Sequence, residues 1–244
     1  MSAAAFSGFG PQAVPFLKAL GFHQSREWFH ENKALYEGEL RRPLVDLVET
    51  VTQRFEERGI PLRGTRKGSL FRINRDVRFS KEKHPYNTHV SAVLTRTGTK
   101  KDTGGVYMHF APDGVSFAGP EQGSFFASGL WFPPSPLLKA MRQRVISHYG
   151  EFTRLVRDLE ANGLAIGHDQ MLTRTPQGFK DIDDPQQLDW LKHKSFVVSR
   201  QIPDTRLRSS DLADDVVRFA EQVMPFMQFV WRATDHLREE DGNA

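Results

Sequence analysis

Apolar side chains recur at two spacings along the chain, and the change of spacing divides it into three stretches. Between residues 11 and 59 they recur every three or four positions, which is typical of amphipathic helices. Between residues 70 and 132 they alternate with polar residues, which is typical of strands with one buried face. Helical spacing returns after residue 133. This order of elements predicts an α+β fold.

The alternating stretch is expected to form most of one sheet. The sequence Pro112-Asp-Gly114 is typical of a tight turn between two antiparallel strands. Consecutive strands with short connections favour antiparallel pairing. We therefore expect one domain over residues 1–244, with a mainly antiparallel central sheet of about five or six strands, N-terminal and C-terminal helices on its flanks, and a disordered tail over residues 239–244. The predicted strands cover residues 70–79, 88–95, 106–110, 115–118, 124–132 and 195–202.

Serine, glycine and proline indicate where the helices should begin, break or bend. Ser25 and Ser135 precede helical patterns and are predicted N-caps. Gly38 and Gly150 fall inside helical patterns and are predicted interruptions. Pro225 lies within the last apolar stripe and should kink that helix.

The segment 70–79 concentrates charged residues on a predicted strand. Phe71, Ile73, Val77 and Phe79 alternate with polar residues, but Arg75 falls on the apolar side of the alternation. Two explanations are open for Arg75: a bulge redirects it, or it is buried and paired with a carboxylate.

Charge is distributed unevenly along the chain. The net charge is +3, yet residues 60–101 hold 11 basic and 2 acidic side chains. Residues 150–244 hold 12 basic and 17 acidic side chains. The basic block 60–101 favours an anionic ligand or nucleic acid. It is equally consistent with a solvated surface whose charges pair with the acidic C-terminal third.

Within the basic block, Arg72, Asp76 and Arg78 share one face of the predicted strand, about 6–7 Å apart per two-residue step. Arginine presents paired donors that suit phosphate or carboxylate, whereas a carboxylate among cations is a poor base and is expected to orient an arginine. The loop that follows adds further cations, and a second basic stretch lies near Arg174-Thr-Pro-Gln-Gly178. The predicted anion-binding residues are Arg72, Arg75, Arg78, Lys83, Tyr86, Arg174 and Lys194, with Asp76 as an orienting residue.

Several kinds of site are absent from the sequence. The chain has no cysteine, which excludes disulfides, thiolate catalysis and cysteine-ligated metals. It has no phosphate-binding or dinucleotide-binding glycine motif and no paired-histidine metal motif. We expect no metal and no cofactor, and the residues identify no catalytic set. His89 and His109 lie on predicted strands and could be neighbours.

Two features bear on location. The N-terminus has no basic region followed by an apolar stretch, and no apolar run reaches about 18 residues. We therefore expect a cytoplasmic protein without a membrane partner. The sequence indicates no particular oligomeric state.

A resemblance to a known family rests on motifs spread along the chain. The central motif runs from Phe71 to Tyr86, and smaller motifs are Gly105-Val-Tyr-Met-His109, Gly129-Leu-Trp131 and Lys194-Ser-Phe196. Together they resemble the bacterial and fungal family called domain of unknown function 2461, over nearly the whole chain. The family pattern commonly has lysine and aspartate where this chain has Asn87 and Glu82. The resemblance implies one compact domain and no particular activity.

Three hypotheses of function remain from the sequence. The first is an anion-binding site for a phosphorylated small molecule or nucleotide. The second is a nucleic-acid-binding module that uses the basic block 60–101. The third is a non-catalytic scaffold for protein interaction. The alternation of arginines beside aromatic residues favours the first, since nonspecific nucleic-acid binding commonly uses a broader lysine-rich surface.

Overall fold

The computed structural model describes residues 5–78, 83–113, 123–168 and 170–242. It confirms the α+β class and contains one antiparallel sheet in which four strands pair in the order β1-β2-β3-β4. This is fewer than the predicted five or six strands. The predicted strand 115–118 lies outside the described residues. The strands are β1 (Val90–Thr95), β2 (Gly105–Phe110), β3 (Ser124–Leu130) and β4 (Phe196–Ile202).

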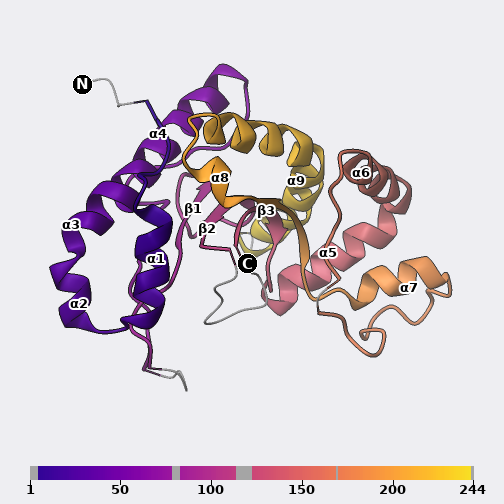
Figure 1. Ribbon diagram of the computed structural model, residues 1–244. Helices are drawn as coiled ribbons and strands as arrows, with labels where there is room; N and C mark the ends of the chain where they lie inside the picture. The colour runs from indigo at the N-terminus through magenta and orange to yellow at the C-terminus, as the bar shows by residue number, and fades with distance from the viewer. Residues whose placement is uncertain (1–4, 79–82, 114–122, 169, 243–244) are drawn as a thin grey trace. The chain divides into compact units, whose positions relative to one another are not determined.

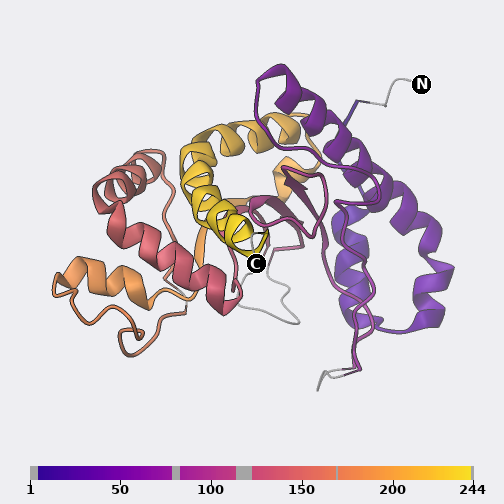
Figure 2. The ribbon, with the colours of Figure 1, turned by 180° about the vertical axis from the view of Figure 1, so that it is seen from behind.

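The chain divides into two compact units, and the division falls within β2, β3, β4 and the last helix. Unit 1 comprises Met1–Asp102, Val106–Phe126 and Arg200–Ala220. Unit 2 comprises Thr103–Gly105, Ala127–Ser199 and Glu221–Ala244. Figure 1 labels the elements of both units, and Figure 2 gives the reverse view. The expectation of a single domain over residues 1–244 stays a prediction.

The N-terminal part of unit 1 is helical, and its longest helix packs on the sheet. α4 buries Leu44, Leu47, Val48, Val51 and Phe55 along one face and contacts β1. α1 contacts α3, and both views show α1 to α4 as one group. The helices of unit 1 are α1 (Ala13–Phe22), α2 (Arg26–Glu31), α3 (Lys33–Tyr36), the π-helix η1 (Glu37–Arg41), α4 (Arg42–Glu57) and α8 (Asp204–Leu207).

In this part of the chain the predicted N-cap is confirmed, whereas the predicted helix interruption is wrong. Ser25 caps α2 as expected, because its Oγ accepts a hydrogen bond from the backbone N–H of Trp28. The predicted break at Gly38 is wrong. The helical path continues there as a π-helical turn, in which the N–H of Arg42 bonds to the carbonyl of Glu37. Pro43 does not break the path either, since it occupies the first turn of α4, where a missing N–H is tolerated.

The predicted strand 70–79 is also wrong, because this segment pairs only at isolated points. Leu70 forms a bridge with Ala92, and Asn74 forms one with Tyr86. The four-residue step from Leu70 to Asn74 therefore faces a six-residue step from Tyr86 to Ala92, so the register is not regular. Phe71, which the alternation placed in the core, is 42% exposed. Phe79 lies outside the described residues.

Unit 2 gathers its core around one aromatic ring. Phe152 is fully buried and contacts the rings of Trp190 at 4.9 Å, Phe229 at 5.5 Å and Phe196 at 6.4 Å, measured between centroids. The helices are α5 (Ser135–Ser147), α6 (Tyr149–Ala161) and α7 (Pro185–Lys192), and α9 (Leu212–Gly242) contributes its C-terminal part.

Two helix ends in unit 2 differ from the prediction. Ser135 is the first residue of α5 and Pro134 occupies the cap position, so the predicted serine cap is wrong. The interruption predicted at Gly150 occurs instead at His148, whose backbone leaves the helical region at φ −125° and ψ 40°. The described residues between 163 and 184 form neither a helix nor a regular strand. α9 continues past Pro225 to Gly242, and residues 243 and 244 of the expected tail lie outside the described residues.

No helix in the described ranges is both long enough and apolar enough to cross a membrane.

A glycine near the N-terminus should be essential to the packing of unit 1. Gly8 has a φ of 107°, and a Cβ added there would overlap the carbonyl oxygen of Arg208. Gly8→Ala should therefore lower the free energy of unfolding by about 2 kcal/mol or more, through backbone strain and steric overlap. Gly38→Ala is the matched control, since a Cβ there meets nothing within 4 Å. Urea unfolding followed by circular dichroism measures both. Equal stability of the two variants would contradict this role for Gly8.

Candidate functional site

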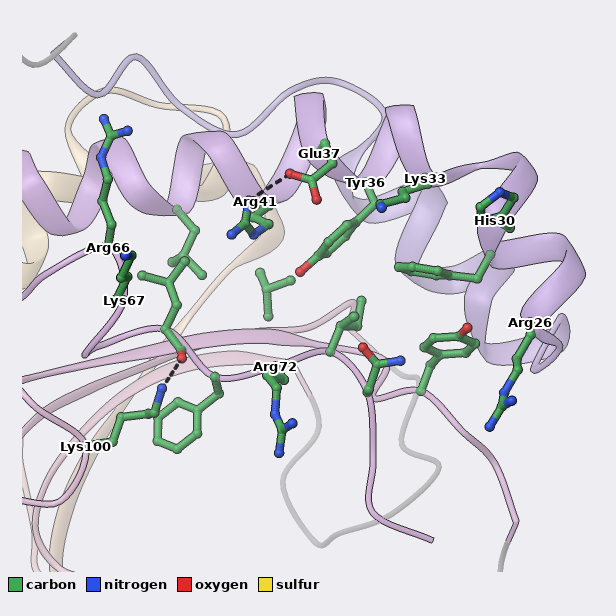
Figure 3. Close-up of a pocket in the computed structure, with 18 residues that line it drawn as sticks. Arg26, His30, Lys33, Tyr36, Glu37, Arg41, Arg66, Lys67, Arg72 and Lys100 are labelled. Atoms are coloured by element: carbon green, nitrogen blue, oxygen red, sulfur yellow. Dashed lines mark hydrogen bonds and ion pairs between the residues drawn. The ribbon is translucent and has the colours of Figure 1, made fainter.

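Unit 1 contains an open cavity of about 900 Å³ between its helices and the irregular segment that follows them. Figure 3 shows the helices along one wall and the segment around Arg72 along the other. A volume of this size falls within the range of small-molecule sites. All residues that line it belong to unit 1.

The helical wall is a single stripe of side chains. Its members recur every three or four residues through α2, α3, η1 and the start of α4, so they share one face of the helical path. The lining residues of this wall are Arg26, Phe29, His30, Lys33, Tyr36, Glu37, Arg41 and Leu44.

The opposite wall is held in place by backbone hydrogen bonds rather than by a regular strand. Phe71 N–H donates to the carbonyl of Ser91 at 3.0 Å, and Asn87 N–H donates to the carbonyl of Ile73 at 2.7 Å. The side-chain amide of Asn87 donates to the carbonyl of Arg72 at 3.2 Å. These bonds hold residues 70–74 along the cavity, and all five of them line it. The lining residues of this wall are Arg66, Lys67, Leu70, Phe71, Arg72, Ile73, Asn74, Tyr86, Val90 and Lys100.

Aromatic rings join the two walls at one end of the cavity. Phe29 of α2 stacks on Tyr86 with ring centroids 4.4 Å apart and an interplanar angle of 19°. Phe29 also contacts Tyr36 at 5.4 Å. The backbone N–H of Tyr86 donates to Oε1 of Gln24 at 3.0 Å, which fixes the position of the tyrosine beside α2.

Tyr36 places a hydroxyl group in the cavity. The residue is 8% exposed, and its hydroxyl points between the two walls in Figure 3. Burial raises the pKa of Tyr36 to about 12, and the neighbouring Arg41 offsets only part of that effect. The hydroxyl therefore stays protonated at neutral pH. It has no hydrogen-bond partner in the described part of the chain, so it is available as a donor to a ligand.

The cavity is strongly cationic. Of its described lining residues, seven are Lys or Arg and one is acidic. That acidic residue, Glu37, is paired with Arg41 at 3.0 Å. Arg66 is held by Glu49 through two hydrogen bonds, of 2.5 and 3.2 Å. Among the described residues, no hydrogen bond or ion pair engages the side chains of four of the cations, which are Arg26, Lys33, Lys67 and Arg72.

The structure places the predicted site residues in different surroundings. Arg72 and Tyr86 line the cavity. Asp76 and Arg78 form an exposed ion pair of 2.6 Å outside the lining, and hydrogen bonds from Arg78 lower the pKa of Asp76. Lys83 Nζ donates to the carbonyl of Val77 at 2.9 Å. Two of the predicted residues, Arg72 and Tyr86, therefore line the cavity, and an anion-binding role stays a prediction for all of them.

Among the described residues, Arg75 has neither of the two surroundings that the sequence left open. Its backbone N–H donates to the carbonyl of Pro85 at 2.8 Å. The side chain is half-buried, and its charge adds to the effect of burial in lowering the pKa of His89. It has no ion pair with a carboxylate within the described chain. The extra residues in the register lie on the partner segment between Tyr86 and Ala92, so no bulge lies at Arg75 itself.

Arg174 and Lys194 belong to unit 2. Arg174 is exposed in the irregular stretch before α7. The backbone N–H of Lys194 donates to the carbonyl of Gln170 at 3.2 Å, and its side chain is half-buried. Their role in anion binding stays a prediction.

Sequence reasoning missed the cations on the helical wall. Phe29, Lys33 and Tyr36 fall in the helical stretch 11–59, and none of them was predicted as a site residue. Their three- and four-residue spacing with Arg26 and Arg41 was visible, but core helices show the same spacing. The signal that distinguishes them is the presence of cations within the stripe, where a core-facing stripe would be apolar.

The histidine pair is a second cluster in unit 1, and the predicted proximity is confirmed. The rings of His89 and His109 lie 4.1 Å apart between centroids. Nδ1 of His109 is 3.1 Å from the hydroxyl of Tyr107, and the His109 ring stacks on Phe125 at 4.6 Å. Burial lowers the pKa of His89 to about 4 and that of His109 to about 3, so both imidazoles are neutral at pH 7.

In the described ranges, no three or more His, Cys, Asp or Glu side chains form a group that could hold a metal ion.

The fold and cavity define an α+β protein with a cation-lined pocket beneath a helical wall. The family described as "Conserved hypothetical protein (DUF2461)" matches residues 12–229, and the chain belongs to this family. Searches of the curated proteins and of the solved structures find no significant match.

The histidine pair predicts a loss of stability in acid. The unfolded chain takes up protons near the ordinary pKa of 6.5, whereas folded His89 and His109 resist protonation until about pH 4 and 3. The unfolded state therefore binds more protons between these values, and the free energy of unfolding should fall as the pH drops below 6.5. The double variant His89→Gln/His109→Gln should lose less stability than the parent between pH 7.5 and pH 4.5, measured by urea unfolding.

Tyr107→Phe is the matched control for this experiment. It removes the hydroxyl next to His109 and leaves both histidines in place, so the parent's dependence on pH should persist. An unchanged slope of stability against pH in the double variant would show that the acid sensitivity arises elsewhere.

Proposed function

We propose that the cavity of unit 1 binds a phosphorylated small molecule or nucleotide. The observation that carries the proposal is the set of four cations, Arg26, Lys33, Lys67 and Arg72, which border a space of about 900 Å³ without a described side-chain partner. Like charges around one space repel each other, so a bound anion would relieve that repulsion.

The mixture of side chains in the cavity supports a phosphate ester over a bare ion. Arginine and lysine are the usual donors to phosphate. Apolar residues such as Leu44, Ile73 and Val90 line the same space and suit the organic part of a ligand. The protonated hydroxyl of Tyr36 supplies a neutral donor between them. The proposal concerns binding and assigns no reaction step. We also propose a cytoplasmic location, as the sequence led us to expect.

Binding should depend on Lys33 and Tyr36. A thermal-shift panel of inorganic phosphate, sugar phosphates and nucleotides should identify ligands that raise the melting temperature, since a ligand that binds only the folded state stabilises it. For a ligand found in this way, Lys33→Gln should weaken the Kd about tenfold by removal of one charged contact, and Tyr36→Phe about fivefold by loss of one hydrogen bond. Isothermal titration calorimetry measures both changes.

Lys101→Gln is the control, because Lys101 is an exposed neighbour of Lys100 outside the lining. It should bind as the parent does. If no phosphorylated compound raises the melting temperature, or if Lys33→Gln and Lys101→Gln bind alike, the proposal is wrong.

One observation favours nucleic acid as a second candidate. Phe71 is 42% exposed at the cavity, and Lys100 Nζ lies 5.5 Å from the centroid of its ring. An exposed ring beside cations can stack on a base while the cations contact phosphates.

The scaffold hypothesis stays a prediction. The described ion pairs of the basic block, Arg66–Glu49 and Arg78–Asp76, lie within unit 1.

Salt separates the nucleic-acid candidate from the first. Binding of single-stranded oligonucleotides, followed by fluorescence anisotropy, should weaken steeply as the salt concentration rises, because each phosphate contact releases counterions. Phe71→Ala should reduce affinity by about 1 kcal/mol or more per stacked base. Undetectable binding at low salt, or a Kd independent of salt, would exclude this candidate.

A further inference from the structure

Among the described phenylalanine and tyrosine rings that line the cavity, Phe71 is the most exposed. It is 42% exposed, whereas Tyr36 and Tyr86 are buried and Phe29 is half-buried. Those three rings also pack on one another, since Phe29 contacts both tyrosines. Phe71 therefore presents apolar ring surface that the described chain leaves partly uncovered.

The ring of Phe71 is nevertheless held in position by its neighbours. The backbone N–H of Phe71 donates to the carbonyl of Ser91. The ring packs against the ring of Tyr107, with centroids 5.8 Å apart and an interplanar angle of 77°. The Tyr107 hydroxyl in turn lies 3.1 Å from Nδ1 of His109. Because the ring is already positioned, a flat group that stacks on it orders little else, and binding is favoured by this preorganisation.

A cation lies next to this ring because the segment is not a regular strand. Consecutive side chains of a regular strand point to opposite faces. Residues 70–74 pair only at isolated points, and both Phe71 and Arg72 line the cavity. Within the described residues, no hydrogen bond or ion pair engages the side chain of Arg72. One ligand can therefore contact the ring and the guanidinium group together.

Lys100 supplies a second donor close to the ring. Its Nζ lies 5.5 Å from the centroid of the Phe71 ring and donates to the carbonyl of Leu70. An ammonium group has three N–H donors, so this bond leaves donors for a ligand. In Figure 3, Lys100 and Arg72 lie on the same wall of the cavity.

We propose that the ligand of the cavity is a nucleotide whose base stacks on the ring of Phe71. The phosphate group contacts Arg72, and Lys100 supplies a further donor beside the base. This inference rests on the proposed function, because it names the ligand class of the same cavity and the residue that selects it.

A phosphate ester without an aromatic group does not use this arrangement fully. It contacts the cations but leaves the ring of Phe71 exposed to water. A base covers that ring and adds the stacking interaction, and every base has a π-face with which to do so. Phe71 is therefore the residue that distinguishes a nucleotide from a sugar phosphate.

The test is isothermal titration calorimetry on the full chain, with AMP, GMP, CMP and UMP compared with ribose 5-phosphate. Ribose 5-phosphate has the same sugar and phosphate and lacks the base, so the difference in Kd measures the contribution of the base. At least one of the four nucleotides should bind about tenfold tighter than ribose 5-phosphate.

Three variants locate the base and the phosphate. Phe71→Leu should weaken that nucleotide about tenfold and leave ribose 5-phosphate unchanged, whereas a purely structural role of Phe71 would affect both ligands. Phe71→Tyr is the matched control, since it keeps an aromatic ring and should keep the difference. Arg72→Gln should weaken both ligands about tenfold by removal of one charged contact. Both side chains are exposed, and a melting temperature for each variant verifies that it folds.

The outcomes separate this inference from the proposed function. If no nucleotide binds tighter than ribose 5-phosphate, or if the difference persists in Phe71→Leu, stacking on Phe71 is wrong and the phosphate site stands. If Arg72→Gln leaves both affinities unchanged, the assigned phosphate contact is wrong. If single-stranded oligonucleotides bind and the four nucleotides do not, the ligand is a nucleic acid and this inference is wrong. If neither these compounds nor any other phosphorylated compound binds, the inference and the proposed function are both wrong.

Discussion

The contact between Phe29 and Tyr86 is the interaction on which the cavity depends. One ring comes from the second helix and the other from the segment that leads into β1, so their stack at 4.4 Å joins two parts of the chain that are distant in sequence. Stacked aromatic pairs contribute about 0.5–1.5 kcal/mol beyond the area that they bury. The hydrogen bond from Tyr86 to Gln24 acts at the same place. The helical wall and the extended wall are thereby fixed at a separation that leaves room for a ligand between them.

The same stretch of chain contributes to both the core and the cavity. In the segment 69–75, Ser69 and Ile73 are buried while Arg72 and Asn74 are exposed at the cavity. In the helices, Tyr36 is buried, and its hydroxyl points between the two walls of the cavity in Figure 3. The cations of the cavity extend from a backbone whose other face packs against the core. This packing offsets the repulsion among the cations, which take no part in it.

Periodic patterns predicted the elements that repeat regularly, and failed where pairing depends on a partner segment. β1, β2, β3 and β4 were all located from alternation, because each is a regular strand with neighbours in register. Residues 70–79 alternate equally well, but their partner segment has two extra residues between the bridges, and a single sequence cannot show that. His89 and His109 were predicted neighbours because adjacent strands present residues side by side. Arg26, Lys33 and Arg41 were missed, since a helical stripe indicates a shared face and not what that face meets.

The π-helical turn Glu37–Arg41 has a consequence for the whole helical wall. A π-turn contains one residue more than an α-turn over a similar path, and each residue of an α-helix turns the chain by about 100°. The extra residue therefore sets the rotation of α2 and α3 relative to α4. Without it, the side chains from Arg26 to Tyr36 would face roughly a quarter-turn or more away from the extended wall, while α4 kept its place on the sheet. The length of one helical turn thus sets the direction in which the cations of the helical wall point. The identity of those side chains does not affect that direction.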